Sequence, residues 1–337
     1  MKKPFRFGNT VFPNNVFFAP LAGCSDLPYR QMARRYRPGI VYCEMVKMDA
    51  LVRHDPTTYR MLDYTPDMHP IGAQLCGSNP KFARAAAKLV EEAGFDVLDF
   101  NCGCPVDKVT KDGSGSGMLK TPELLGEVLR EMVAAVNIPV TVKIRIGWDE
   151  QNINAVEVTK IAEAAGAKAI TIHGRTRAQG YSGPANWEPI RACKQVAKEM
   201  HVIGNGDVFD AESAERLLST TGCDGVLVAR GAMGQPWIAE DIVQRLNGLP
   251  AIERTVFDVR DALLTHCDLI LQYQSERQAL LDMRRIGAWY LKRLEGVKPL
   301  RMLINRSTST VETLQAITSH PWSEVCFTTQ SVLVETE

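Results

Sequence analysis

Short apolar runs alternate with amphipathic stretches over about the first 230 of the 337 residues. Each run is rich in β-branched or aromatic residues and ends in Gly, Cys, Asn, His or Arg. The runs are 16–22, 40–46, 70–76, 96–102, 139–146, 168–173, 201–205 and 225–230. Helical patterns lie between them at 81–93, 122–136, 152–165 and 211–219. Strands that alternate with helices in this way predict parallel βαβ units.

Eight such units favour a closed α/β barrel, the (β/α)8 or TIM barrel, over an open doubly wound sheet. Polar residues recur at the carboxyl end of nearly every run, whereas an open sheet would concentrate them at one switch point. After a helix at 237–246 comes a break at 247–250, followed by helical patterns only, at 257–274, 276–294, 297–306 and 310–319. We therefore expect a barrel over 1–246 and a small all-helical C-terminal domain over 251–337.

The composition is that of a globular protein, and the apolar runs and cysteines indicate in which cellular compartment the protein works. No apolar run approaches the roughly 18 residues that a membrane span needs. The nine cysteines are scattered without a framework spacing, so we expect free thiols and a cytoplasmic protein. Lys+Arg and Asp+Glu are both 39, so any nucleic-acid binding has to rest on a local cluster of charge.

Cationic residues gather at the predicted carboxyl ends of the late strands. Lys143 and Arg145 are two apart in one strand, so both side chains lie on one face and can point into the barrel mouth. The alternative interpretation is that these cations form an internal ion pair with an acid such as Asp99 or Glu44. Chemistry in such barrels sits at this end, which favours a functional role.

Two glycine-rich loops follow the seventh and eighth strands and predict a phosphate site. They are Gly204-Asn-Gly-Asp207 and Gly231-Ala-Met-Gly234, and Arg230 adds a charge beside the second. The loops at these positions often hold phosphate through backbone N–H groups. Any one glycine also fits an ordinary turn, and the pattern alone does not separate a flavin from a sugar phosphate.

The fourth strand ends in Asn101-Cys-Gly-Cys-Pro105. One residue between two thiols is too short for the usual zinc spacing, so we expect no metal. A thiol on a loop over a ligand site can instead act as an acid, because it stays mostly protonated at neutral pH. We assign that role to Cys104 and an inert, buried state to Cys102. His173, at the end of the sixth strand, fits a ligand contact or a core hydrogen bond.

Several motifs together resemble the tRNA-dihydrouridine synthase family, in particular its bacterial B-type branch. The motifs run in family order: Pro20-Leu-Ala-Gly-Cys-Ser-Asp26, Asn101-Cys-Gly-Cys-Pro105, Val142-Lys-Ile-Arg-Ile-Gly-Trp148, His173-Gly-Arg-Thr-Arg-Ala-Gln-Gly-Tyr-Ser-Gly183, Gly204-Asn-Gly-Asp207 and Ala229-Arg-Gly-Ala-Met-Gly-Gln-Pro-Trp237. Farther on, Arg284-Arg-Ile-Gly-Ala-Trp-Tyr-Leu-Lys292 resembles the signature of the family's helical domain.

The resemblance implies an FMN enzyme that uses NADPH to reduce a D-loop uridine of tRNA to 5,6-dihydrouridine. Cys104 would then be the catalytic proton donor. Asn101, Arg145 and Arg175 would orient the uracil, and Arg284 and Arg285 would contact the tRNA. The residues that would contact the cofactor are Pro20, Leu21, Ala22, Gln74, Lys143, His173, Asn205, Gly206, Asp207, Ala229 and Arg230.

Local charge agrees with an RNA substrate. The stretch 281–306 holds seven Lys or Arg against two acids, with Trp289 and Tyr290 among them. A second cluster, with Arg30, Arg34, Arg35 and Arg37, follows the first strand. Basic residues that track phosphates give affinity rather than base identity.

Two other functions remain open at this point. A flavin barrel that acts on a free pyrimidine, as dihydroorotate dehydrogenases do, would explain the cysteine loop but not the basic helices. A noncatalytic RNA-binding protein would explain the helices but not Cys104, Lys143 and the two phosphate loops together. We expect a monomer as the default.

Overall fold

Eight parallel strands close into a barrel in the computed structural model, which describes residues 5–328. Around the barrel, each strand pairs with its neighbours in the chain, and β10 pairs with β3 to close the circle. The strands are β3 (Val16–Phe18), β4 (Ile40–Lys47), β5 (Ile71–Cys76), β6 (Val97–Cys102), β7 (Val140–Arg145), β8 (Ala169–His173), β9 (His201–Asn205) and β10 (Gly225–Val228). All eight predicted strands are therefore confirmed.

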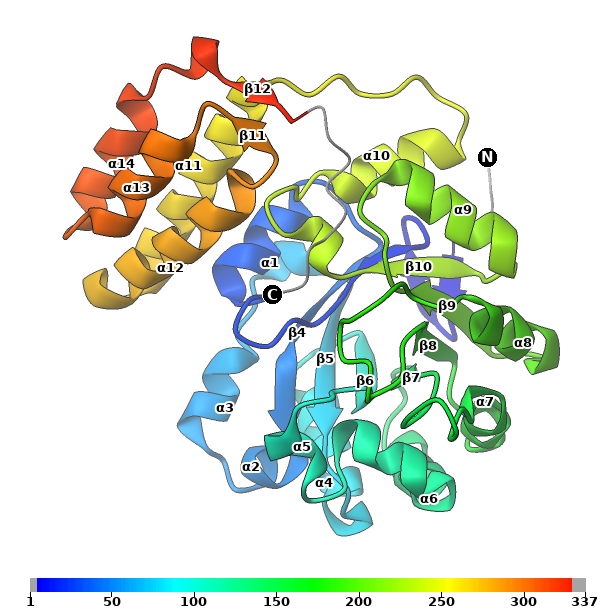
Figure 1. The fold of residues 1–337 in the computed structure, drawn as a ribbon. Helices are drawn as coiled ribbons and strands as arrows, with labels where there is room; N and C mark the ends of the chain where they lie inside the picture. The colour runs from blue at the N-terminus through cyan, green and yellow to red at the C-terminus, as the bar shows by residue number, and fades with distance from the viewer. Residues whose placement is uncertain (1–4, 329–337) are drawn as a thin grey trace.

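Helices surround the barrel, as Figure 1 shows. Several begin at a side chain that accepts a backbone N–H, as Asp26 and Asn79 do, with proline in the first helical turn. The helices are α1 (Leu27–Arg34), α2 (Met48–Val52), α3 (Pro56–Met61), α4 (Pro80–Glu92), α5 (Asp107–Thr110), α6 (Pro122–Val133), α7 (Ala155–Ala164), α8 (Glu188–Val196), α9 (Ala211–Thr221) and α10 (Ile238–Leu246).

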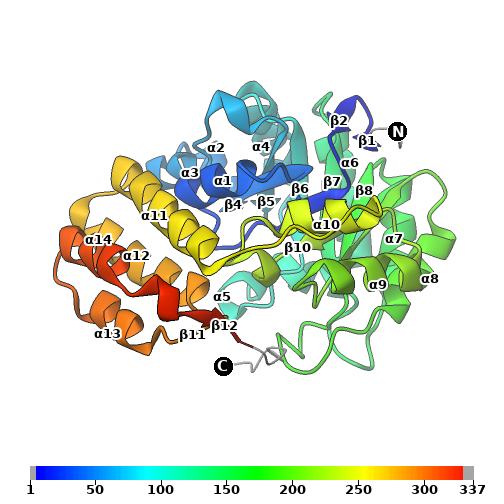
Figure 2. The same cartoon turned by 90° about the horizontal axis from the view of Figure 1, so that it is seen from above.

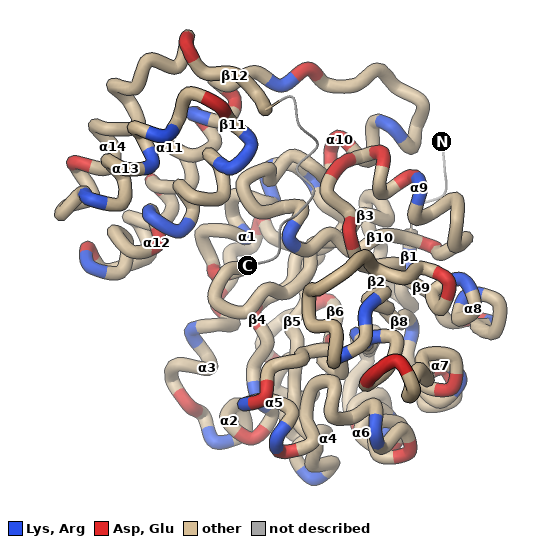
Figure 3. Tube along the Cα trace, viewed as in Figure 1, with Lys and Arg blue, Asp and Glu red and all other residues tan. Residues whose placement is uncertain are grey.

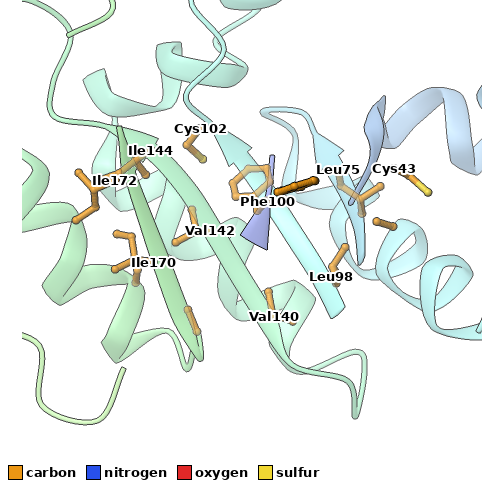
Figure 4. Packing of buried hydrophobic residues seen from close by; sticks show 14 of the residues in the cluster. Cys43, Leu75, Leu98, Phe100, Cys102, Val140, Val142, Ile144, Ile170 and Ile172 are labelled. Atoms are coloured by element: carbon orange, nitrogen blue, oxygen red, sulfur yellow. The ribbon is translucent and has the colours of Figure 1, made fainter. Parts of the chain in front are cut away.

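The strands present alternate residues to two different environments. On β6, Leu98 and Phe100 pack outward against the helices, within the apolar layer that Figure 4 shows. Asp99 and Asn101 point inward and bond to side chains of neighbouring strands. This period of two puts the polar residues of the strands inside the barrel, towards the end that carries the site.

A hairpin of two short strands closes the other end of the barrel. β1 (Phe5–Phe7) pairs antiparallel with β2 (Thr10–Phe12). Phe7 and Phe12 are buried with Phe17 at the start of β3, in an apolar cluster that also takes in the beginnings of other strands. This hairpin was not predicted from the sequence.

The chain after α10 forms a helical segment that packs beside α1 (Figure 2). Its own core includes Met32 of α1 and Trp237 of the barrel. The segment contains α11 (Val256–Tyr273), α12 (Glu276–Tyr290), β11 (Leu294–Glu295), α13 (Lys298–Arg306), α14 (Thr310–Ser319) and β12 (Cys326–Phe327). The ends of both predicted domains, 1–4 and 329–337, lie outside the described residues.

Two predicted boundaries were wrong. The strand predicted at 16–22 ends at Phe18, because the chain turns at Leu21, whose carbonyl accepts from the N–H groups of Cys24 and Ser25. The helix predicted at 276–294 ends at Tyr290, and Leu294–Glu295 instead pairs with Cys326–Phe327. That pairing brings two short segments together across the helical segment, which local periodicity cannot reveal.

Candidate active site

A cavity of about 750 Å³ opens at the carboxyl ends of the strands. Its walls come from the loop after β3, from the loops after β6, β8, β9 and β10, and from inward-facing residues of β5 and β7. All the residues predicted to contact a cofactor line it: Pro20, Leu21, Ala22, Gln74, Lys143, His173, Asn205, Gly206, Asp207, Ala229 and Arg230. Asn101, Cys104 and Arg145 line it as well.

The backbone of Cys104 is held on both sides by polar contacts. Its N–H donates to Asn101 Oδ1 at 2.9 Å, and its carbonyl accepts from the N–H and the hydroxyl of Ser116 at 3.0 and 2.9 Å. Ser116 lies in the short 3-10 helix Gly115–Lys120 and is buried. Cys104 is half-buried and borders the cavity, so these contacts fix the position of its backbone in the wall.

The neighbouring Cys102 has a different environment. It is fully buried in the apolar layer outside the barrel. Burial raises its pKa well above the ordinary value of a thiol, so the group stays neutral. This contrast agrees with the inert state predicted for Cys102.

Lys143 lines the cavity with an ammonium that has no bonded partner among the described residues. Within residues 5–328 its ammonium makes no hydrogen bond or ion pair, although Asp99 lies near enough to favour its charged form. Burial, with the like charge of Arg145, lowers the pKa of Lys143 to about 8. An ammonium of this kind is suited to a ligand oxygen that carries or gains negative charge.

Arg145 instead braces the loops around the cavity. Its Nε donates to the carbonyl of Gly103 at 2.9 Å, and its Nη1 donates to the carbonyls of Thr176 and Gly180. No acid pairs with it in the described chain, so the alternative of an ion pair with Asp99 or Glu44 is wrong for Arg145. Its contacts connect the Cys104 loop to the loop after β8.

The loop after β9 follows a backbone path that requires glycine at position 206. Gly206 has a φ of +119°, and a Cβ there would lie 2.8 Å from Ala185 Cβ. Asp207, also at positive φ, receives two hydrogen bonds from Arg175 at 2.8 and 2.9 Å and one from the Ala185 N–H. This ion pair leaves Arg175 outside the cavity lining, where it supports the loop.

His173 is buried among cations at the end of β8. Burial, together with the charges of Lys143, Arg145 and Arg175, lowers its pKa well below the usual value for histidine. The imidazole is therefore neutral at neutral pH, and it borders the cavity. A neutral ring can donate one hydrogen bond to a ligand and accept another.

Several residues of the cavity wall were missed by the sequence analysis. Tyr181 and Phe209 lie under the guanidinium of Arg230, at 4.7 and 5.7 Å from ring centre to Cζ. Met45 also lines the cavity. The sequence signal available for Tyr181 was its place within the long segment 173–183, whereas nothing local marked Phe209.

Many predicted RNA-contacting cations bond instead within the protein. Arg285 pairs with Asp26 and Asp282 at 3.2 Å. Arg284 donates to the carbonyl of Ser307, and Arg293 donates to Gln235 and to the carbonyl of Phe209. The predicted basic surface is therefore smaller than the charge count suggests.

A basic surface nonetheless remains on α12 and α13, where Figure 3 shows several Lys and Arg positions. Arg284, Lys292 and Arg301 border a small cavity of about 110 Å³ between these helices. Arg284 and Arg301 each donate to a backbone carbonyl, of Ser307 and Leu291 respectively. No acid forms an ion pair with any of the three among the described residues, so their charges are not neutralised. We name this surface the α12–α13 basic pocket.

The second predicted cluster, after β3, is largely structural. Arg30 is buried and donates to the carbonyls of Ser25 and Asp63, so the expectation that it reaches RNA is wrong. Arg34 donates to the carbonyls of Pro38 and His69. Arg35 and Arg37 are exposed.

Within residues 5–328 the structure has neither a cluster of metal ligands nor a helix that could span a membrane. No group of three or more His, Cys, Asp or Glu side chains is placed to hold a metal ion. No helix there has the length and apolar character needed to cross a bilayer.

The cavity fits a phosphorylated flavin. The apolar stretch Ala19–Ala22 lines one part of the wall, Lys143 and Gln74 offer polar contacts inside, and Arg230 lies beside Asp207 in the loop after β9, where a phosphate would find a cation. Barrel fold and site together define a flavin-dependent oxidoreductase of the (β/α)8 class.

Comparison with known proteins identifies the family. The model of the dihydrouridine synthase family matches residues 17–325, so the chain belongs to that family. A probable tRNA-dihydrouridine synthase 1 of Synechocystis is 38% identical over 301 residues, 89% of this chain and 84% of the relative. A tRNA-dihydrouridine synthase B of Pseudomonas aeruginosa is 38% identical over 309 residues, 90% and 92% of the two chains.

Solved structures show the same fold at much lower identity. Histamine dehydrogenase from Rhizobium sp. 4-9 superposes with a TM-score of 0.57 at 15% identity, over 79% of this chain and 50% of that one. A 2-naphthoyl-CoA reductase gives a TM-score of 0.55 at 12% identity, over 74% and 52%. These likenesses support the barrel architecture alone.

Proposed function

We propose that this chain reduces a D-loop uridine of tRNA to 5,6-dihydrouridine, with FMN as its flavin and NADPH as the reductant. Family membership gives the reaction, and the names of the relatives give tRNA as the substrate. The observation that carries the proposal is Cys104, a thiol with a fixed backbone in the wall of the cavity that Lys143 also lines.

Reduction of a uracil 5,6 double bond needs a hydride at carbon 6 and a proton at carbon 5. A bound flavin would supply the hydride. Cys104 supplies the proton from its thiol, since Asn101 and Ser116 fix the loop that carries it. Lys143 lines the cavity, and its ammonium would stabilise negative charge on a bound flavin.

The remaining predicted residues divide between cofactor and substrate. Pro20, Leu21 and Ala22 form the apolar wall, while Asn205 to Asp207, Ala229 and Arg230 surround the phosphate end. Asn101 keeps one amide N–H for the uracil, because its other contacts use only one of the two. We assign Arg145 and Arg175 to holding the loops that border the uracil.

The helical segment would bind the rest of the tRNA. We propose the division made from the sequence, a catalytic barrel over 1–246 and a tRNA-binding helical domain over 251–337. The α12–α13 basic pocket, with Arg284, is the part of it best suited to a phosphate. The target base has to leave its stack to reach the cavity, which costs least in an exposed loop.

We also propose a monomeric, cytoplasmic enzyme that uses no metal. The nine cysteines are all free thiols in the structure, as a reducing compartment requires. Gel filtration with light scattering checks the oligomeric state.

The decisive experiment is a single turnover. The purified, photoreduced protein is mixed anaerobically with unmodified tRNA, and flavin absorbance and the mass of the RNA are followed. We expect rapid flavin oxidation and a gain of two hydrogens in the tRNA. Oxidation by a free pyrimidine but not by tRNA would establish the small-molecule enzyme, and absence of flavin would favour the noncatalytic RNA-binding protein.

A further inference from the structure

Three polar side chains inside the barrel form one hydrogen-bonded chain that leads to Cys104. Gln74 Nε2 donates to Asp99 Oδ2 at 2.7 Å, and Asn101 Nδ2 donates to Gln74 Oε1 at 2.8 Å. Asn101 Oδ1 then accepts the backbone N–H groups of Gly103 at 3.1 Å and of Cys104 at 2.9 Å. The residues sit on the adjacent strands β5 and β6, with Gln74 and Asp99 directly opposite each other.

The chain has a polarity that starts at Asp99. A carboxylate only accepts hydrogen bonds, whereas each amide has one donating and one accepting end. Burial raises the pKa of Asp99 to about 6, so the group is still ionised at neutral pH. Thr141 donates to its other oxygen, so both oxygens of the carboxylate are used as acceptors.

Each orientation along the chain follows from the one before it. Gln74 must turn its amide nitrogen to Asp99, which leaves its oxygen for Asn101. Asn101 must then turn its own nitrogen to Gln74, which leaves Oδ1 as the acceptor for the Cys104 loop. With the opposite amide orientation, Asn101 would present N–H groups to two backbone N–H groups, and neither bond would form.

We propose that Asp99 is a positioning residue which, through Gln74 and Asn101, fixes the amide orientations that hold the backbone of Cys104. Asp99 itself is buried beneath the cavity and is absent from its lining, so it acts through the other two. Only the role of Cys104 as proton donor rests on the proposed function. The effect on the Cys104 loop is independent of it.

Two variants separate an acceptor role from a charge role. Asp99→Asn keeps an oxygen that can accept from Gln74, and the Thr141 hydroxyl can rotate to accept from the new amide. Asp99→Leu has a similar size but no acceptor. Thr171→Val is the matched control, because Thr171 is also buried, on β8, and its hydroxyl makes no hydrogen bond within residues 5–328.

The first readout needs neither flavin nor substrate. Flavin-free protein is treated with iodoacetamide, and alkylation of the peptide that contains Cys104 is followed by mass spectrometry, with the exposed Cys326 as internal reference. We expect Asp99→Leu to raise the rate at Cys104 roughly fivefold, the factor that one lost hydrogen bond is worth. In Asp99→Asn and Thr171→Val, the alkylation rate at Cys104 should remain within about twofold of that in the parent protein.

The second readout uses the flavin-loaded protein. Asp99→Leu should slow oxidation of the reduced flavin by tRNA roughly tenfold, which is less than the roughly hundredfold or larger effect of losing a general acid, because the acid is misplaced and not removed. Reduction by NADPH should stay within about twofold of the parent rate. Failure of the parent protein to be oxidised by tRNA would count against the proposed function and would leave the alkylation result intact.

Three results overturn the proposal: an unchanged alkylation rate in Asp99→Leu, equal impairment of Asp99→Asn and Asp99→Leu, or an unchanged rate in Gln74→Met. The last variant removes the middle of the chain and decides the matter if Asp99→Leu does not fold. If both fold, the double variant should react no faster than either single one, because both break the same chain.

Discussion

Arg285 of α12 and Asp26 at the start of α1 form an ion pair of 3.2 Å that connects the helical segment to the barrel. The same guanidinium donates to the carbonyl of Gly23 and lies over the ring of Trp289. Because Ala22 and the adjoining residues line the cavity, the segment proposed to bind tRNA directly supports one wall of the flavin site.

Arg285→Met should therefore weaken flavin binding as well as the use of tRNA. We expect the Kd for FMN to rise about fivefold, because the charge-assisted hydrogen bonds to the Gly23 carbonyl and to the Asp26 carboxylate are lost. Fluorescence titration of flavin-free protein measures it. Arg277→Met, an exposed cation on the same helix without a bonded partner in the described chain, is the control. An unchanged Kd for FMN would show that the contact does not support the wall.

Cys104→Ala should separate the two halves of the reaction. We expect flavin reduction by NADPH at the parent rate and oxidation by tRNA slowed by about a hundredfold or more, as for loss of a general acid. Stopped-flow absorbance follows both steps. Cys326→Ser, which changes an exposed thiol far along the sequence, should leave both rates unchanged. Oxidation at the parent rate in Cys104→Ala would remove the proton-donor role.

Loss of the Lys143 charge should slow the reaction at alkaline pH. The Lys143 pKa of about 8 lies below that of an ordinary lysine, so the ammonium is present below this pH and is lost above it. Flavin reduction by NADPH should fall about tenfold between pH 7 and 9, following the charged fraction. Lys143→Met should be slow and nearly independent of pH, while Lys168→Met, at an exposed position, should keep the parent profile. A parent profile that stays flat to pH 9 would contradict the assignment.

The α12–α13 basic pocket predicts a salt-dependent loss of affinity. Lys292→Met and Arg301→Met should each weaken tRNA binding and lower the slope of log K against log salt by about one, as expected for one phosphate contact. Filter binding at several salt concentrations measures both quantities. Lys88→Met, on the barrel helix α4, provides the control. Unchanged slopes would mean that tRNA docks elsewhere on the helical segment.

Asp224 should make the barrel sensitive to acid. Burial raises its pKa, but the neighbouring His201, with hydrogen bonds from Lys194 and from the Val202 N–H, outweighs burial and lowers the pKa to about 2, below the value in an unfolded chain. The stabilisation is present above about pH 4 and is lost as the pH falls towards 2; Asp224→Asn should lose about 2 kcal/mol at pH 7. Urea unfolding at pH 7 and pH 3 tests this, and an equal deficit at both values would contradict it.

Much of the barrel was predictable because its signals are local. Each of β5 to β10 is a short β-rich run that ends in polar residues, and those ends meet in one cavity as expected. The contacts made by Lys143 and Cys104 with the cavity follow from the same logic, since a strand end fixes where its side chains point.

The partners of the charges were not predictable. Arg285 was assigned to RNA from its place in a basic stretch, yet one of its two acids, Asp26, lies 259 residues away in sequence, and only Asp282 is a local partner. Arg30 was likewise counted as surface charge, although the fold buries it against two carbonyls. Asp99 was considered as an ion-pair partner, but its bond to Gln74 depends on the register of β5 against β6.

The aromatic hairpin at the other end of the barrel bears on the order in which ligands bind. Phe7 and Phe12 pack against the beginnings of the strands and close the barrel interior at that end. In the proposed reaction, NADPH and tRNA would then both reach the flavin through the open end of the cavity. They would bind one after the other, so the proposed enzyme would alternate between a form that reacts with NADPH and a form that reacts with tRNA.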